Sequence, residues 1–253
     1  MPRFNIEQYL RYLPDNTTYI DVSSKCIYEL PDITRFTNLQ HLDCDDNNLT
    51  SLPALPESLI YLSCHRNNLR SLPALPANLQ YLYCCSNPLR SLPLTLPENL
   101  VHLYCASNKL TSLPALPANL LHLLCTDNKL NSLPVLPESL QYLHCGHNIL
   151  TSMPMLPESI SSFGYCFNPI WENQRQIICN HNPGDQSSLH ITIKQINTYN
   201  SFRNLYAGDQ SSIVITIKQI NTYNSFRHLY YSLKFKNQFK DVPVVPTPGW
   251  NCI

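Results

Sequence analysis

The chain has 253 residues, a formal net charge of zero and a sequence pI near 7.1. At that length, one domain or one repeat array can bury a substantial core. A neutral total argues against a dominant role on nucleic acid or on an anionic membrane, because phosphate binding requires a basic surplus. Neither is therefore expected as a partner.

Residues 1–16 are predicted to form a short helix that caps the fold. Apolar side chains recur there at helical spacing, and Pro14 would end the helix. The apolar positions are Ile6, Tyr9, Leu10 and Leu13. The same segment lacks the long apolar stretch of a secretory signal, and no window of the chain approaches 18 uninterrupted apolar residues. We therefore expect neither signal-peptide secretion nor membrane insertion, and we predict a cytoplasmic location.

Residues 17–173 are dominated by one repeating pattern, L-x-x-L-x-C-x-x-N-x-L-x-S-L-P-x-L-P-x-x. Six units fit the pattern, and the third carries one extra residue, in SLPLTLPEN. The units are 39–58, 59–78, 79–99, 100–119, 120–139 and 140–159. A degenerate unit lies at each end, as expected of terminal repeats that shield a stack from water. The pattern predicts a solenoid of about eight turns, two of them degenerate.

Each fixed position of the unit has a physical role. Leu62 and Cys64 alternate with Tyr61 and Ser63, and this period of two predicts a short strand whose leucine and cysteine point inward. The asparagine that ends the strand can bond to backbone groups at the bend, so stacked copies predict a polar ladder inside the coil. The ladder residues are Asn47, Asn67, Asn87, Asn108, Asn128, Asn148 and Asn168. The two prolines of SLPALP remove N–H donors, so the return side is predicted to be extended or polyproline-like.

This pattern resembles that of leucine-rich repeat proteins. The twenty-residue unit and its LPxLPxxL return are similar to the short LPX type found in bacterial effector proteins. The cysteine position, the TSLP and RSLP runs and the segments NPIWENQRQIICNHNP and LYYSLKFKNQFK resemble leucine-rich repeat proteins of giant DNA viruses of the Mimivirus type. The resemblance implies a curved α/β-class solenoid of short parallel strands whose concave face binds a protein. For a viral protein it also implies a virus–host interaction in the host cytoplasm.

The outward positions of the strands would make the concave surface rich in tyrosine and histidine. Tyrosine joins an apolar ring to a polar hydroxyl and is enriched at protein interfaces. The alternative is that the rings only stack between neighbouring strands, but a solvent-facing aromatic stripe favours binding. The predicted partner-binding residues are His41, Asp43, Tyr61, Tyr81, Tyr83, His102, Tyr104, His122, Tyr142 and His144.

These features favour a non-enzymatic protein-interaction scaffold without a cofactor. No Gly-rich phosphate loop, HExxH or GxSxG motif occurs in the sequence, and no catalytic residue is assigned. Two alternatives are a substrate-recognition part of a ubiquitin-ligase-type effector and a structural virion component. The sequence leaves open the identity of the partner and the oligomeric state.

The cysteines are candidates both for core residues and for catalytic thiols. The column within the repeats is expected to point inward and to act as a set of small hydrophobes, whereas Cys85 is expected to point outward. The column contains Cys44, Cys64, Cys84, Cys105, Cys125 and Cys145. Cys44-x-Asp46 and Cys125-x-Asp127 match a short motif of the ubiquitin-ligase domain of some LPX effectors. That domain is a large helical module for which the chain has no room, and an inward thiol cannot meet a substrate.

A cluster of histidines is a candidate metal site. His122, His144 and His147 are predicted to face the same side near His102, and three imidazoles can hold zinc. Their spacing matches no standard motif, so ordinary surface contacts are favoured and no metal is predicted.

The remaining sequence departs from the repeat. Residues 184–207 recur almost unchanged as 208–231, with 20 of 24 positions identical. Within each copy the first half alternates like a strand and the second half fits a helix, so residues 174–240 are predicted to be a partly helical extension. Its role is either docking or dimerisation, or that of a simple cap with a partly disordered extension. The Pro-rich residues 241–253 are predicted to be disordered.

Overall fold

The computed structural model describes residues 4–165 and 167–169. The predictions for the duplicated extension and the final tail lie outside these residues. The described chain forms one α-helix followed by eight β-strands. These elements are α1 (Ile6–Tyr12), β1 (Tyr19–Asp21), β2 (His41–Asp43), β3 (Tyr61–Ser63), β4 (Tyr81–Tyr83), β5 (His102–Tyr104), β6 (His122–Leu124), β7 (Tyr142–His144) and β8 (Ser162–Gly164).

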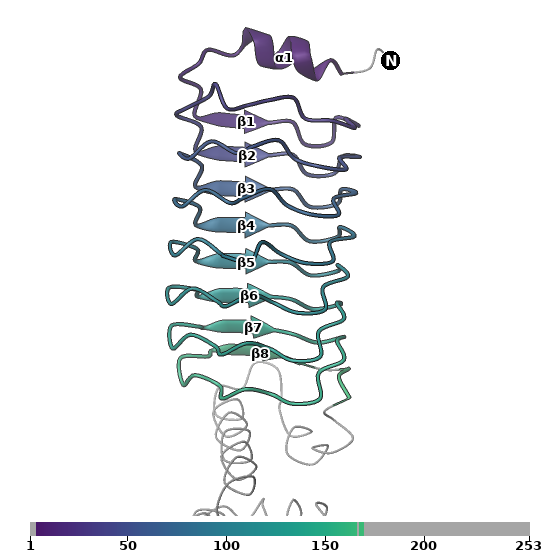
Figure 1. The fold of residues 1–253 in the computed structure, drawn as a ribbon, viewed down its shortest axis with the longest axis vertical. Helices are drawn as coiled ribbons and strands as arrows, with labels where there is room; N and C mark the ends of the chain where they lie inside the picture. Colours follow the sequence, from purple (N-terminus) through teal and green to yellow (C-terminus); the bar gives the residue numbers. More distant parts are fainter. Residues whose placement is uncertain (1–3, 166, 170–253) are drawn as a thin grey trace, which may run out of the picture.

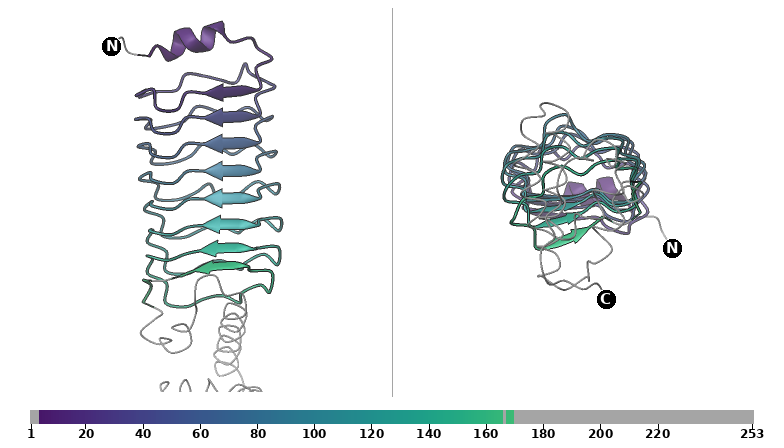
Figure 2. Two further views of the ribbon diagram at one scale, coloured as in Figure 1. Left: turned by 180° about the vertical axis from the view of Figure 1, so that it is seen from behind. Right: turned by 90° about the horizontal axis from the view of Figure 1, so that it is seen from below.

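The eight strands form one parallel sheet in chain order, β1 to β8, and each strand belongs to one turn of a coil (Figure 1). Seen along the stack, the turns lie over one another, with the strands on one side and the return segments opposite them (Figure 2). The predicted fold class, a leucine-rich repeat-type solenoid with a short N-terminal helix, is confirmed for the described part of the chain.

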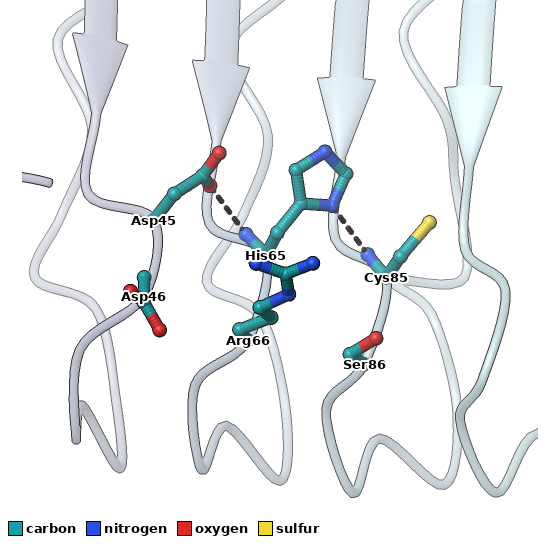
Figure 3. A pocket seen from close by; sticks show the side chains of 6 residues that line it. All are labelled: Asp45, Asp46, His65, Arg66, Cys85 and Ser86. Carbon is teal, nitrogen blue, oxygen red and sulfur yellow. Dashed lines mark hydrogen bonds between the residues drawn. The ribbon is translucent and has the colours of Figure 1, made fainter. Parts of the chain in front are cut away.

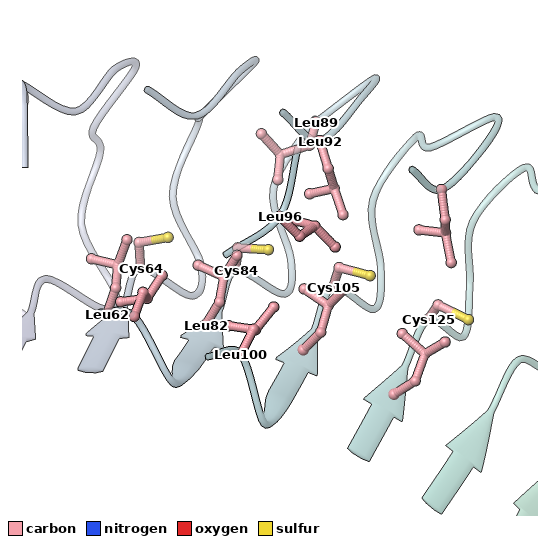
Figure 4. Close-up of a cluster of buried hydrophobic side chains, with 14 of the residues drawn as sticks. Leu62, Cys64, Leu82, Cys84, Leu89, Leu92, Leu96, Leu100, Cys105 and Cys125 are labelled. Atoms are coloured by element: carbon pink, nitrogen blue, oxygen red, sulfur yellow. The ribbon is translucent and has the colours of Figure 1, made fainter. Parts of the chain in front are cut away.

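The core of the solenoid is built from the same positions in every turn. The middle residue of each strand is buried, and the two residues that flank it are nearly always more exposed. The six cysteines of the predicted column are each 0% exposed. In Figure 4 the thiols and the leucines of successive turns lie on the same side of the strands. The prediction that these cysteines point inward is therefore confirmed.

The return side is extended, as predicted. Among the described residues no α-helix follows Tyr12, because the prolines of each unit lack the N–H groups that a helix requires. The second proline instead closes a turn: the Leu59 N–H donates to the Pro56 carbonyl oxygen at 3.1 Å, and the equivalent bond recurs in each following unit.

The ladder asparagines bond each turn to the one before it. The Asn108 Oδ1 accepts the Leu89 N–H at 3.1 Å, while its Nδ2 donates to the carbonyl oxygens of Cys84 at 3.0 Å and Cys105 at 3.1 Å. The same arrangement recurs at Asn67, Asn87, Asn128, Asn148 and Asn168. All seven ladder side chains are buried. Loss of these bonds would leave buried backbone groups unpaired, which costs more free energy than the loss of a solvent-exposed hydrogen bond.

The residue before each ladder asparagine adopts a left-handed backbone conformation, with φ between 47° at Arg66 and 59° at Phe167. This conformation costs a non-glycine residue roughly 1–2 kcal/mol. The bonds of the following asparagine hold the bend in place and offset that cost. The tight bend turns the chain from the sheet into the return segment.

The N-terminal helix covers the first turn of the coil (Figure 1). Asn5 caps α1, since its side chain accepts the Gln8 N–H at 2.9 Å. Leu10 is buried, and Arg35 from the first repeat donates to the Leu10 carbonyl oxygen and to Asp15. No helix of the described residues is long and apolar enough to cross a membrane.

Candidate functional site: the strand face

The outward positions of the strands form two columns, which together we call the strand face. The first column contains Tyr19, His41, Tyr61, Tyr81, His102, His122, Tyr142 and Ser162, and the second contains Asp21, Asp43, Ser63, Tyr83, Tyr104, Leu124, His144 and Gly164. All ten predicted partner-binding residues lie in these columns; their role in binding stays a prediction. Tyr19 and Asp21 extend the columns by one strand and were missed. Their alternation around the apolar Ile20 was the available signal.

The rings of the first column touch from turn to turn. Tyr19 and His41 stack with centroids 4.5 Å apart, and His41 and Tyr61 stack at 3.9 Å with an interplanar angle of 6°. Further along, His102 stacks on His122 at 4.2 Å, and His122 on Tyr142 at 5.5 Å. The in-register strands place equivalent side chains one above another, and aromatic pairs at such distances are favourable.

The second column widens this aromatic surface at the centre of the sheet. Tyr83 meets Tyr104 edge to face at 4.9 Å and lies 5.2 Å from Tyr61 in the first column. Burial raises the pKa of Tyr83 to about 12, so the phenol stays protonated and can donate a hydrogen bond at neutral pH. The centre of the strand face is therefore a continuous set of touching rings with hydroxyl groups.

At the C-terminal end of the face, His144 packs closely against its neighbours. The His144 ring stacks on Tyr142 at 4.1 Å, and its Nε2 lies 3.1 Å from the Ser162 hydroxyl. Gly164 leaves room for this ring, because a Cβ atom there would lie 2.9 Å from the His144 Nδ1. Burial lowers the pKa of His144, so the neutral imidazole is favoured.

A recess of about 350 Å³ lies beside the N-terminal end of the face, where the strands turn. Its lining residues are Asp45, Asp46, His65, Arg66, Cys85 and Ser86 (Figure 3). The Asp45 carboxylate accepts the Ser63 hydroxyl at 2.8 Å and the His65 N–H at 2.6 Å. Burial raises the pKa of Asp45. These bonds cover Ser63, which is 1% exposed although its column faces outward.

The outward cysteine is less accessible than expected. Cys85 is half-buried, and its N–H donates to the His65 Nδ1 at 3.1 Å. Burial raises the pKa of the Cys85 thiol, as it does for Cys44 and Cys125 in the two Cys-x-Asp segments. A thiol is a good nucleophile only as the thiolate, so none of these cysteines is in a reactive environment.

The histidines do not converge as predicted. His144 lies on β7 and packs on Tyr142, whereas His147 lies in the following turn and stacks on Phe167 at 4.3 Å. His122 and His144 both lie on the strand face, as predicted. The prediction was wrong for His147, because the left-handed bend at that residue turns the chain out of the strand. Within residues 4–165 and 167–169, no group of three His, Cys, Asp or Glu side chains is arranged to hold a metal ion.

Comparison with known proteins agrees with this geometry. The Leucine Rich Repeat family matches residues 38–59. No curated protein matches the chain. Among solved structures, YopM from Yersinia enterocolitica is 40% identical over 62% of this chain and 34% of its own, with a TM-score of 0.60. YopM from Yersinia pestis, described as a leucine-rich effector protein, is 34% identical over 61% of this chain and 49% of its own, with a TM-score of 0.53.

The functional domain of InlJ from Listeria monocytogenes, described as including a cysteine ladder, is 31% identical. The match covers 61% of this chain and 36% of InlJ, with a TM-score of 0.57. This chain thus spans only about a third to a half of the length of these three proteins. The likeness to all three lies in the repeated coil.

Proposed function

We propose that this leucine-rich repeat protein, which resembles bacterial leucine-rich repeat effectors, is a non-enzymatic scaffold that binds a partner protein on its strand face. The observation that carries the proposal is the continuous aromatic surface across β1–β7, whose rings touch one another and keep part of their area in solvent. Tyrosine-rich surfaces of this kind bind through large ring contacts at a low entropic cost.

The rigidity of the coil supports the same function. Each turn is bonded to the next through the sheet and the asparagine ladder, so the strand face is formed before a partner arrives. A preformed surface loses little conformational entropy on binding. The YopM proteins supply the analogy of an effector, and we extend it to this chain as a role in the cytoplasm of a host cell. The similarity to giant-virus repeat proteins makes a virus–host interaction part of the proposal.

The test is to remove two rings at the centre of the face. We expect Tyr83→Ala combined with Tyr104→Ala to abolish capture of the partner in an affinity pull-down followed by mass spectrometry. The melting temperature should fall by only about a few degrees, because both rings are partly exposed. Retained capture by the folded double variant would overturn the assignment of the strand face.

A matched control is available in two exposed tyrosines outside the strand face, Tyr12 and Tyr28. The double variant Tyr12→Ala with Tyr28→Ala also removes two phenols from the protein but leaves the strand face intact. It should capture the partner as the original chain does. If it loses capture equally, binding depends on tyrosines elsewhere.

A further inference from the structure

Carboxylates gather at the N-terminal end of the strand face. Asp21 on β1 and Asp43 on β2 are direct neighbours in the parallel register. Asp45 follows β2, and its N–H donates to the Asp43 Oδ1 at 3.0 Å. Neighbouring strands of a sheet lie ~4.8 Å apart, so the three acidic residues occupy one small area.

The strand face itself supplies no cation to this area. None of the sixteen outward positions in β1–β8 is Lys or Arg. The one ion pair between described residues joins Arg35 to Asp15, away from the strand face. Two cations lie in the turns that follow the strands: Lys25 after β1, whose charge helps to lower the pKa of Asp21, and Arg66 after β3. Like charges side by side on adjacent strands oppose stacking, and no side chain of the strand face offsets that repulsion.

Aromatic rings border the same carboxylates. Tyr19, His41 and Tyr61 form the tightest ring stack of the first column, and the carboxylate charges of Asp21 and Asp43 act on His41. Burial nevertheless lowers the pKa of His41, so at neutral pH the imidazole is uncharged and leaves the acidic charge uncompensated. The combination is negative charge next to flat apolar surface.

We propose that this acidic aromatic end, formed by Tyr19, Asp21, His41, Asp43 and Tyr61, binds an extended Lys- or Arg-bearing segment of the partner protein. The proposal rests on the proposed function and names the chemistry of the partner at one end of the face. Carboxylates pair with ammonium and guanidinium groups through charge-assisted bonds. The rings receive the aliphatic stems or the planar guanidinium group. The same charge repels nucleic acid and anionic lipid.

The test uses the full chain and a defined probe, a fluorescein-labelled 12-residue peptide of alternating Arg and Ser, measured by fluorescence anisotropy. We expect saturable binding that weakens when NaCl is raised from about 50 mM to about 300 mM. The double variant Asp21→Asn with Asp43→Asn should bind at least about tenfold more weakly, because it keeps the shape and one acceptor oxygen in each side chain but removes the charges. Circular dichroism would verify that the variant is folded.

A matched control and two competing outcomes complete the test. Glu57→Gln with Glu98→Gln removes two exposed charges from the return side and should leave peptide binding unchanged. No binding, or equal loss in both double variants, would overturn the proposal. Concentration-dependent self-association that only the Asp21→Asn and Asp43→Asn changes abolish would also overturn it, with a second copy as the occupant.

The same variants separate this proposal from the proposed function. If Tyr83→Ala with Tyr104→Ala abolishes partner capture while the Asp21→Asn and Asp43→Asn variant captures normally, the strand face binds but the cationic segment is wrong. If capture survives both pairs of changes, the strand face itself is not the binding site.

Discussion

The two sides of the same eight strands obey different constraints. On the inner side, leucine, cysteine and asparagine recur at equivalent places in almost every turn, and the side chains are buried. On the outer side, the second column alone passes through Asp, Ser, Tyr, Leu, His and Gly. Inner residues must fit the turn above and the turn below, which leaves little freedom. The outer residues contact one another but are not enclosed between turns, so their identities vary more along the sheet.

The largest loss of stability is expected from changes to the polar residues of the inner side. Asn108→Ala removes the side chain that bonds to Leu89, Cys84 and Cys105, and it leaves buried backbone groups without partners. We expect the free energy of unfolding to fall by roughly 3–5 kcal/mol, measured by urea denaturation. The exposed Asn131 is the matched control, and Asn131→Ala should cost less than about 0.5 kcal/mol. Similar small losses at both sites would mean that the ladder is not essential.

A smaller effect is expected from the inner thiols. Cys105→Ser places a hydroxyl in the packed column and should lower the free energy of unfolding by about 1–3 kcal/mol. Cys85→Ser makes the same change at a half-buried place and should cost about 0.5 kcal/mol or less. A water-soluble thiol reagent should modify the exposed Cys26 quickly and the inner column only on unfolding. Rapid modification of Cys105 in the native protein would contradict the inward assignment.

The smallest predicted effect is on the pH dependence of stability, and it comes from a histidine of the outer side. Burial and the neighbouring His122 imidazole lower the pKa of His102, whose Nδ1 is buried and has no hydrogen-bond partner among the described residues. The unfolded chain therefore binds the proton more readily than the folded chain does. The contribution of the neutral His102 to the stability of the fold is complete above the unfolded pKa of about 6.5 and is lost as the pH falls below that value.

We therefore expect the pH dependence of unfolding between about pH 7 and about pH 5 to become shallower in His102→Gln. The change should be only about a few tenths of a kcal/mol, since the ring is only partly buried. His65→Gln is the matched control, because His65 lies outside the ring stack of the first column. An unchanged slope in His102→Gln would show that the histidine pair does not sense pH.

The inner residues could be predicted from the sequence because the period of the repeat reflects how each turn packs on the next. The alternation around Leu62 and Cys64 fixed which residues are buried, and the prolines excluded a helix on the return side. The sequence identified which residues face outward, but it did not predict the contacts that their side chains make. Ser63 is buried beneath Asp45, and Cys85 is partly covered, since such contacts depend on side chains from neighbouring turns. Sequence spacing also gave no sign that the bend at His147 directs that ring to Phe167.

The extra residue of the third repeat has a consequence for how such a protein can change. The register partners Tyr81 and His102 are 21 positions apart rather than twenty, yet β4 and β5 pair as their neighbours do. The surplus length is taken up on the return side, where Leu94 is 93% exposed. We therefore expect the rim opposite the sheet to tolerate inserted loops or affinity tags, while the spacing of the strands is preserved. The length of a return segment can therefore change without altering the register of the strand face.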